Sequence, residues 1–140
     1  MSFSNAVAEG WDDYKPGLIS FMISDYKEQS KDSDYFFTPG MPFKANVEFL
    51  GEFRKIEENR SKYIGMWLKT HGMNPEHINM YSTEVLVKEG KVEYWLPIQK
   101  QLIPYFKKEV PNNKRVNLYV VLAGSIHKDW VFLVNEFRVR

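Results

Sequence analysis

The pattern of apolar and polar positions is clearest in the last quarter of the chain, where it predicts two strands. Residues 115–123 are apolar on both faces, as expected of a strand that is covered on both sides. In residues 130–139, apolar side chains alternate with Glu136 and Arg138, so one face of this strand meets water. Residues 124–129 form the predicted loop between the two strands. The core is predicted to include Phe49, Val120, Leu122 and Leu133.

The N-terminal part of the chain is predicted to be helical. Leu18, Met22 and Tyr26 recur every four residues behind a proline and a glycine, which predicts a helix over residues 17–29. This apolar stripe would stand exposed if the helix were alone in water. We therefore expect it to dock, either on its own chain or in a symmetric dimer.

Three further segments lie before and after this helix. Phe3, Val7 and Trp11 recur at the same spacing, which predicts a shorter helix ahead of it. Residues 31–34 are polar and predict a loop. Residues 35–42 contain two prolines and a glycine, so we expect an extended aromatic connector there rather than a helix or a strand.

The period of the pattern changes to two after this connector. Val47, Phe49, Gly51 and Phe53 share one face of a predicted half-buried strand, in which the glycine permits a bulge. Residues 57–62 are polar and predict a turn. A strand, a turn and a further strand are therefore expected in this part of the chain.

The middle of the chain is predicted to contain that further strand and a hairpin. Residues 63–69 alternate in polarity and predict a strand, and residues 70–82 predict a longer loop. Residues 83–87 and 91–96 predict a tight hairpin, because Gly90 can adopt a positive φ at the turn.

A second helical segment follows the hairpin. Ile98, Leu102, Phe106 and Val110 recur every four residues, as on one face of a helix. Pro104 lies inside this segment and cannot donate a backbone hydrogen bond. We expect either a kink there or a new helix that starts at this proline.

The length of 140 residues and the ordinary composition predict one globular domain. The predicted elements divide it into a helical arm and connector at residues 1–43 and a β-barrel-like body at residues 44–140. Residues 1–40 carry seven acidic and three basic side chains, whereas residues 41–140 carry eleven acidic and sixteen basic ones. The chain has no cysteine, which excludes thiol catalysis, thiolate metal sites and disulfides. A signal peptide or membrane span is not visible, so we expect a cytoplasmic protein.

The order of the predicted elements carries a resemblance to a known fold. After residue 44 the order is strand, strand, hairpin, short helix, strand, strand. This order resembles the OB-fold, the oligonucleotide/oligosaccharide-binding barrel, in which a helix between strands three and four plugs one end. The resemblance implies a mainly β fold with flanking helices, either a small five- to six-stranded OB-like barrel or a strongly curved antiparallel sheet, plus an N-terminal helix. It carries over no functional residues.

Histidines and hydroxyls are the first candidates for catalysis or metal binding. His71 and His77 bracket Glu76, but the two histidines are not four residues apart, as a helical metalloprotease motif requires. Ser125 lies two residues before His127 without the strand-to-helix elbow of a nucleophilic serine. We therefore predict no catalytic residue, no metal site and no cofactor.

Aromatic and basic residues on predicted strands are better candidates for a function. Tyr63, Trp67, Lys69, Tyr94 and Trp95 fall on strands that would form the binding face of an OB-like barrel. On such a face, rings stack on bases or sugars and ammonium groups hold phosphates. The expected function is non-enzymatic binding of a protein or a small ligand, without a membrane partner.

Two alternatives stay open at this point. One is binding of single-stranded nucleic acid on the same face, although eleven acidic residues dilute the positive charge of the body. The other is a small enzyme with a pocket between the helix at 17–29 and the concave sheet, in which His71 or His77 acts as a general base. The N-terminal helix also offers a surface for a homodimer.

Overall fold

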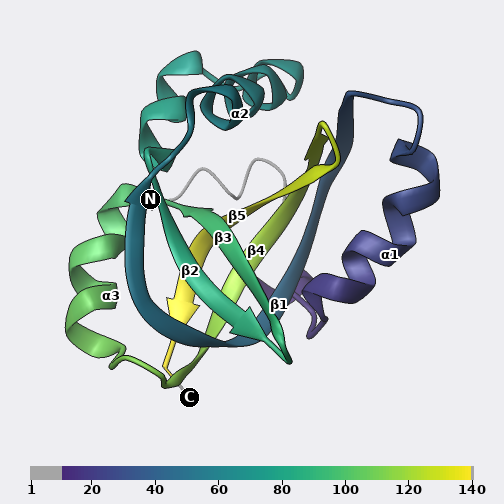
Figure 1. Cartoon of the computed structure of the whole chain (residues 1–140). Coiled ribbons are helices and arrows are strands. Elements are labelled where there is room, and N and C mark those ends of the chain that lie inside the picture. Colours follow the sequence, from purple (N-terminus) through teal and green to yellow (C-terminus); the bar gives the residue numbers. More distant parts are fainter. Residues whose placement is uncertain (1–10, 140) are drawn as a thin grey trace.

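The computed structural model describes residues 11–139, in which a closed β-sheet carries flanking helices (Figure 1). The strands are β1 (Tyr35–Lys55), β2 (Thr83–Glu89), β3 (Val92–Ile98), β4 (Arg115–Ile126) and β5 (Asp129–Arg138). The α-helices are α1 (Ile19–Ser30), α2 (Glu58–Thr70) and α3 (Ile103–Glu109). Short 3-10 turns are η2 (Trp11–Asp13), η3 (Pro75–Tyr81) and η4 (Lys100–Leu102). The predicted helix through Phe3 and Val7 lies outside the described residues.

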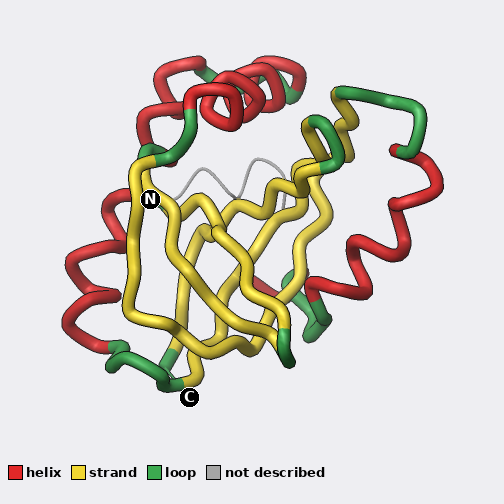
Figure 2. The backbone as a smooth tube through the Cα atoms, viewed as in Figure 1, coloured by secondary structure: helices red, strands yellow, loops and turns green. Residues whose placement is uncertain are grey.

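The sheet closes on itself in the order β1, β2, β3, β5, β4 and back to β1 (Figure 2). Neighbouring strands are antiparallel except β3 and β5, which are parallel. The long strand β1 serves two partners, because its first part pairs with β4 and its last part with β2. The mainly β fold with flanking helices that the sequence predicts is therefore confirmed.

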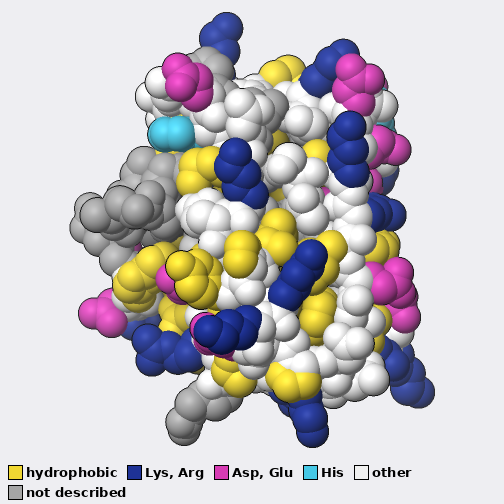
Figure 3. Space-filling view, turned by 90° about the vertical axis from the view of Figure 1, so that its left-hand side faces the viewer, with side chains coloured by type: hydrophobic (Ala, Val, Ile, Leu, Met, Phe, Trp, Pro, Cys, Tyr) yellow, Lys and Arg dark blue, Asp and Glu magenta, His cyan; other side chains and the backbone are white. Residues whose placement is uncertain are grey.

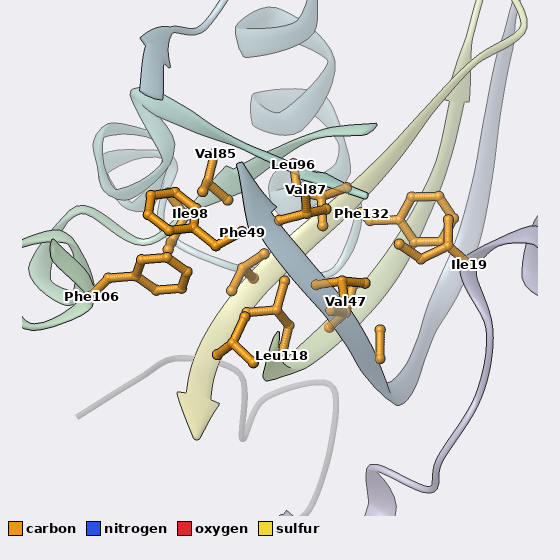
Figure 4. Close-up of a cluster of buried hydrophobic side chains, with 14 of the residues drawn as sticks. Ile19, Val47, Phe49, Val85, Val87, Leu96, Ile98, Phe106, Leu118 and Phe132 are labelled. Atoms are coloured by element: carbon orange, nitrogen blue, oxygen red, sulfur yellow. The ribbon is translucent and has the colours of Figure 1, made fainter. Parts of the chain in front are cut away.

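Apolar side chains form one cluster inside the ring and another on the outer face of β4 and β5. Figure 4 shows the interior cluster, to which β4 contributes Leu118. Val121 and Ala123 of the same strand lie in the outer cluster, so β4 is covered on both faces, as its sequence predicts. The four predicted core residues, Phe49, Val120, Leu122 and Leu133, are all buried.

The predicted turn and strand at residues 57–69 are wrong, because this segment is the helix α2. Its buried side chains include Tyr63, Ile64, Trp67 and Leu68, which are spaced as on one face of a helix. These side chains join the outer cluster and cover β4 and β5. Met66, which a strand would have placed beside its apolar neighbours, is exposed.

The predicted connector at residues 35–42 is also wrong, because it is the first part of β1. Pairing with β4 continues on both sides of a bulge between Phe37 and Met41, where Gly40 has a φ of 97°. The helix α2 donates to two backbone carbonyls in and beside this bulge. The Tyr63 hydroxyl donates to Phe36 O at 2.5 Å, and the Trp67 indole donates to Thr38 O at 3.1 Å.

The predicted loop at residues 124–129 is mostly strand. β4 continues to Ile126 and β5 begins at Asp129, so the turn consists of His127 and Lys128. Both residues have a positive φ, of 49° and 71°, as in the two-residue turns that suit the twist of a hairpin. The other predicted hairpin is confirmed, with Gly90 at a φ of 62°.

The two predicted helical segments are present with small corrections. α1 docks on the chain's own sheet through Ile19, Met22, Ile23 and Tyr26, whereas Leu18, expected on that face, is 41% exposed. A homodimer through this helix stays a prediction. The segment around Pro104 forms η4 and then α3, which has the proline in its first turn. Of the two expectations for this segment, the new helix starting at Pro104 is therefore the one observed. None of the helices in residues 11–139 has the length and apolar character needed to cross a membrane.

Candidate functional site

The closed sheet has an opening between β3 and β5. Within residues 11–139, the ladder joins these strands at one pair, Ile98 and Val134. Trp95 precedes this pair in β3 and Trp130 precedes it in β5, so in these parallel strands both lie on the same side of the pair. In that part of the described chain, β3 pairs only with β2, and β5 pairs only with β4. A cleft of about 250 Å³ lies between them. Its lining comprises Ile23, Arg54, Arg60, Glu93, Tyr94, Trp95, Leu96, Lys128, Asp129, Trp130 and Phe132.

The cleft combines apolar, aromatic and charged surfaces. Leu96 and Phe132 are buried and belong to the interior cluster, so they form its apolar base. Tyr94 and Trp95 of β3 and Trp130 of β5 are half-buried and line the cleft. An apolar site with a few placed polar groups is the usual composition of a small-ligand site.

Arg60 of α2 holds the two edges of the opening together. Its Nη2 donates to Trp95 O at 3.3 Å and its Nη1 to Trp130 O at 3.5 Å. These are carbonyls of β3 and β5, so the guanidinium bridges the strands where ladder hydrogen bonds between them are missing. Arg60 is 4% exposed, and its position depends on the carboxylates that neutralise it.

Two carboxylates balance the charge of Arg60. Its Nε lies 2.7 Å from Oε2 of Glu84, which is fully buried, and its Nη1 lies 3.0 Å from Oδ2 of Asp129. Glu84 also accepts from Nε of Arg54 at 2.9 Å, and the Arg54 guanidinium stacks 4.2 Å from the centre of the Trp95 ring. The network therefore fixes one wall of the cleft, on which the Trp95 ring is held by Arg54.

Tyr94 contributes a neutral hydroxyl beside the cleft. Burial and the negative charge of Glu89 both raise the pKa of Tyr94, so it stays protonated at neutral pH. A protonated phenol both donates and accepts a hydrogen bond. This group can therefore pair with either kind of polar atom on a ligand.

The structure brings together two of the five residues that the sequence suggested for binding. Tyr94 and Trp95 line the cleft. Tyr63 and Trp67 are fully buried under α2 instead, because their segment is a helix and not a strand of the binding face. Lys69 is exposed on the same helix and does not line the cleft.

Sequence reasoning missed Arg54, Arg60, Glu84, Asp129 and Trp130. A helical period over residues 58–70 would have found one of them, because Arg60 precedes Tyr63, Ile64 and Trp67 at the spacing of one buried face. A buried arginine needs a carboxylate partner, and that requirement points to an acidic residue in an apolar strand.

The histidines and Ser125 lie apart from this cleft. Nδ1 of His71 is 2.8 Å from Trp67 O, and the His71 ring packs on the Trp67 indole. The groove between α1 and β1, of about 460 Å³, has neither His71 nor His77 in its lining. Ser125 is fully buried in β4, and the His127 side chain is 58% exposed. Among the described residues, no three His, Asp or Glu side chains lie together as a metal site would require.

A second polar cluster lies near the joint of β3 and β5, and it is structural. The Tyr81 hydroxyl donates to Oδ1 of Asn135, which also accepts from Nε2 of Gln99 at 2.8 Å. All three side chains are buried, and burial raises the pKa of the Tyr81 hydroxyl well above its usual range. These groups satisfy one another and offer no open position to a ligand.

Comparisons of the chain with protein-family models, with curated proteins and with solved structures find no match. The interpretation of the site therefore depends on its geometry and chemistry alone.

Proposed function

We propose that the protein is a non-enzymatic binding module that takes a small ligand in the cleft between β3 and β5. The observation that carries this proposal is the opening in an otherwise closed sheet, with Trp95 and Trp130 on its two edges and the buried guanidinium of Arg60 between them. A concave site lined by aromatic and charged side chains favours a ligand over a purely structural role.

The shape and chemistry of the cleft favour a small ligand with a flat or saturated ring and several hydrogen-bonding groups. The cleft volume of about 250 Å³ lies below the range of about 300 to 1,000 Å³ typical of drug-sized ligands, which favours a compact ligand such as a sugar or a nucleoside over a segment of a partner protein. The aromatic side chains of Tyr94, Trp95 and Trp130 in the lining offer stacking partners, while Asp129, Glu93 and the Tyr94 hydroxyl offer polar partners.

The position of the cleft agrees with the OB-fold resemblance. Five strands and a helix between β3 and β4 match that resemblance, and α3 is this helix. OB-folds bind ligands near strands two and three and the connections that follow strands one and four. Here β3, the helix α2 after β1 and Lys128 in the turn after β4 all border the cleft.

The charge around the cleft gives less support to single-stranded nucleic acid. Arg54, Arg60 and Lys128 in its lining face Glu93 and Asp129, and both arginines already bind Glu84. Away from α1, on the face seen in Figure 3, basic side chains are likewise scattered among acidic and apolar ones and do not form one patch. Strong binding of a phosphate backbone needs a concentrated positive surface.

Thermal shift with a defined panel tests the proposal. The panel contains monosaccharides, disaccharides, nucleosides, nucleotides and a mixed-sequence oligonucleotide. We expect a compound with a single ring system to raise the melting temperature of the unchanged protein and of Tyr105→Ala, whose ring is exposed on α3, but not of Trp95→Ala. An effect confined to the oligonucleotide would favour nucleic acid, and an effect equal in all three proteins would place binding elsewhere.

A further inference from the structure

Charged side chains of two hairpins hold the two ends of α1. At the N-terminal end, Oε2 of Glu89 accepts from Ile19 N–H at 2.6 Å and Oε1 accepts from Ser20 N–H at 3.1 Å. At the C-terminal end, Nζ of Lys128 donates to Ser30 O at 3.3 Å and also to Lys31 O. Glu89 ends β2 and Lys128 lies in the turn before β5, so α1 spans from one hairpin to the other (Figure 1).

The signs of these two charges match the helix they hold. Backbone N–H groups make the N-terminus of a helix positive, and free carbonyls make its C-terminus negative. The residue at the N-cap of α1, Leu18, has no side chain that accepts a hydrogen bond, so the cap is supplied by Glu89 from the sheet. The stability of α1 therefore depends on its contact with the two hairpins.

Between its clamped ends, α1 is packed thinly. Ile19 and Ser30 are its buried residues, and Met22, Ile23 and Tyr26 are half-buried against the interior cluster. Grooves flank the helix on both sides, the cleft of about 250 Å³ next to β3 and β5 and the groove of about 460 Å³ next to β1. An element with little buried apolar surface opens before the rest of a domain unfolds.

The chain is fixed again immediately outside the helix. On one side Gly17 N–H donates to Lys44 O at 3.0 Å, beside a bridge between Pro16 and Lys44. On the other side Asp34 O accepts from His127 N–H at 2.7 Å. α1 can therefore leave the sheet while the segments before and after it stay attached.

From this geometry we propose that α1 is a lid on the cleft between β3 and β5, clamped by Glu89 and Lys128. Ile23 of α1 lines the cleft, so removal of the helix widens the entrance that a ligand must pass. The role of the lid rests on the binding function proposed above, but its movement can be measured in the protein without any ligand. Opening of the lid would set how fast a ligand enters and leaves.

Hydrogen–deuterium exchange of the full chain, read by mass spectrometry on peptides from α1 and β4, tests the lid. In the unchanged protein we expect residues 19–30 to exchange much faster than β4. In Glu89→Ala and in Lys128→Met, exchange of α1 is expected to rise about tenfold, the effect of losing one helix cap, with exchange of β4 unchanged. The matched controls Glu52→Ala and Lys91→Met, at exposed positions, are expected to leave both elements unchanged.

The outcomes separate the lid from the ligand. The lid would be wrong if α1 exchanged as slowly as β4. It would also be wrong if Glu89→Ala and Lys128→Met raised the exchange of α1 and β4 together, because α1 would then open only when the whole sheet unfolds. A panel compound that binds in the cleft is expected to slow the exchange of α1. If no panel compound binds while α1 still exchanges alone and the clamp variants accelerate it, the lid is upheld and the proposed ligand class is wrong.

Discussion

A Cβ atom on Gly124 would lie 1.9 Å from the backbone oxygen of Phe36. It would also lie 2.3 Å from the Tyr63 hydroxyl, which donates to that same oxygen. Strands β4 and β1 and the helix α2 therefore meet at one point where no side chain fits. Gly124 adds a φ of 145°, a conformation that residues with a side chain rarely adopt.

Gly124→Ala is therefore expected to lower the free energy of unfolding by more than about 3 kcal/mol, because the backbone must move and the Tyr63 hydrogen bond is lost. Gly72→Ala is the matched control. Gly72 also has a positive φ, of 74°, but a Cβ there would meet no atom within 4 Å, so we expect a cost of about 1 to 2 kcal/mol. Urea denaturation measures both. Equal losses would contradict the close approach at Gly124.

Glu84 is expected to be the most sensitive charged residue near the cleft. Glu84→Gln removes the buried charge that balances Arg60, and breaking a buried pair in this way costs about 3 to 5 kcal/mol. Arg54→Gln breaks a pair whose arginine side chain is 48% exposed, so we expect a loss of about 1 kcal/mol or less. Urea denaturation of the two variants decides the matter, and a smaller loss for Glu84→Gln than for Arg54→Gln would contradict the account of the network.

Local signals in the sequence predicted the hairpin at Gly90, the helix break at Pro104 and the two-sided cover of β4, because each depends on neighbouring residues. They failed at residues 57–69, where Ile64, Met66 and Leu68 alternate as in a strand. The buried helical face there also includes Tyr63 and Trp67, and a short apolar run fits both periods. Residues 35–42 form a strand because they pair with β4, although two prolines and a glycine disfavour a strand locally.

The sequence predicted only part of the candidate site, because the other residues are brought together by contacts between distant segments. Tyr94 and Trp95 were found as aromatic residues of a strand. Trp130, Arg60 and Glu84 become neighbours only when the sheet closes between β3 and β5, and that closure depends on contacts between distant parts of the chain. A pattern within one segment carries no information about which distant strand will be its partner.

Stability is expected to fall at alkaline pH, in part because of Tyr63. Burial raises the pKa of Tyr63 above the usual value near 10, so the folded form keeps the proton while the unfolded chain loses it. The contribution of this residue is therefore complete below about pH 10 and is lost above it, at about 1.4 kcal/mol per pH unit. Urea denaturation at pH 8 and pH 11 measures this loss.

Tyr63→Phe is expected to be less stable than the unchanged protein at pH 8, because Phe36 O loses a hydrogen bond, and the difference should narrow at pH 11. Tyr105→Phe, at an exposed tyrosine, serves as the control and should show no difference at either pH. A difference that stays constant between pH 8 and pH 11 would contradict the raised pKa of Tyr63.

Leu122 tests the register of β4 inside the ring. Its side chain is fully buried in the interior cluster, so Leu122→Ala is expected to cost about 2 to 5 kcal/mol through the cavity it leaves. Val92→Ala removes methyl groups from a side chain that is 51% exposed and should change the unfolding midpoint little. An unchanged midpoint in Leu122→Ala would mean that the strand is placed wrongly.

The most direct measurement of ligand binding in the cleft uses the four tryptophans of the chain as separate reporters. Each gives one indole N–H signal in a nitrogen–proton NMR spectrum, assigned by single substitution and followed as the sugars and nucleosides of the panel are added. Trp95 and Trp130 line the cleft, whereas Trp67 is fully buried under α2. We predict that a binding compound shifts the signals of Trp95 and Trp130 and leaves that of Trp67 in place. Binding that moves Trp67 or Trp11 while Trp95 and Trp130 stay unchanged would contradict the proposed site.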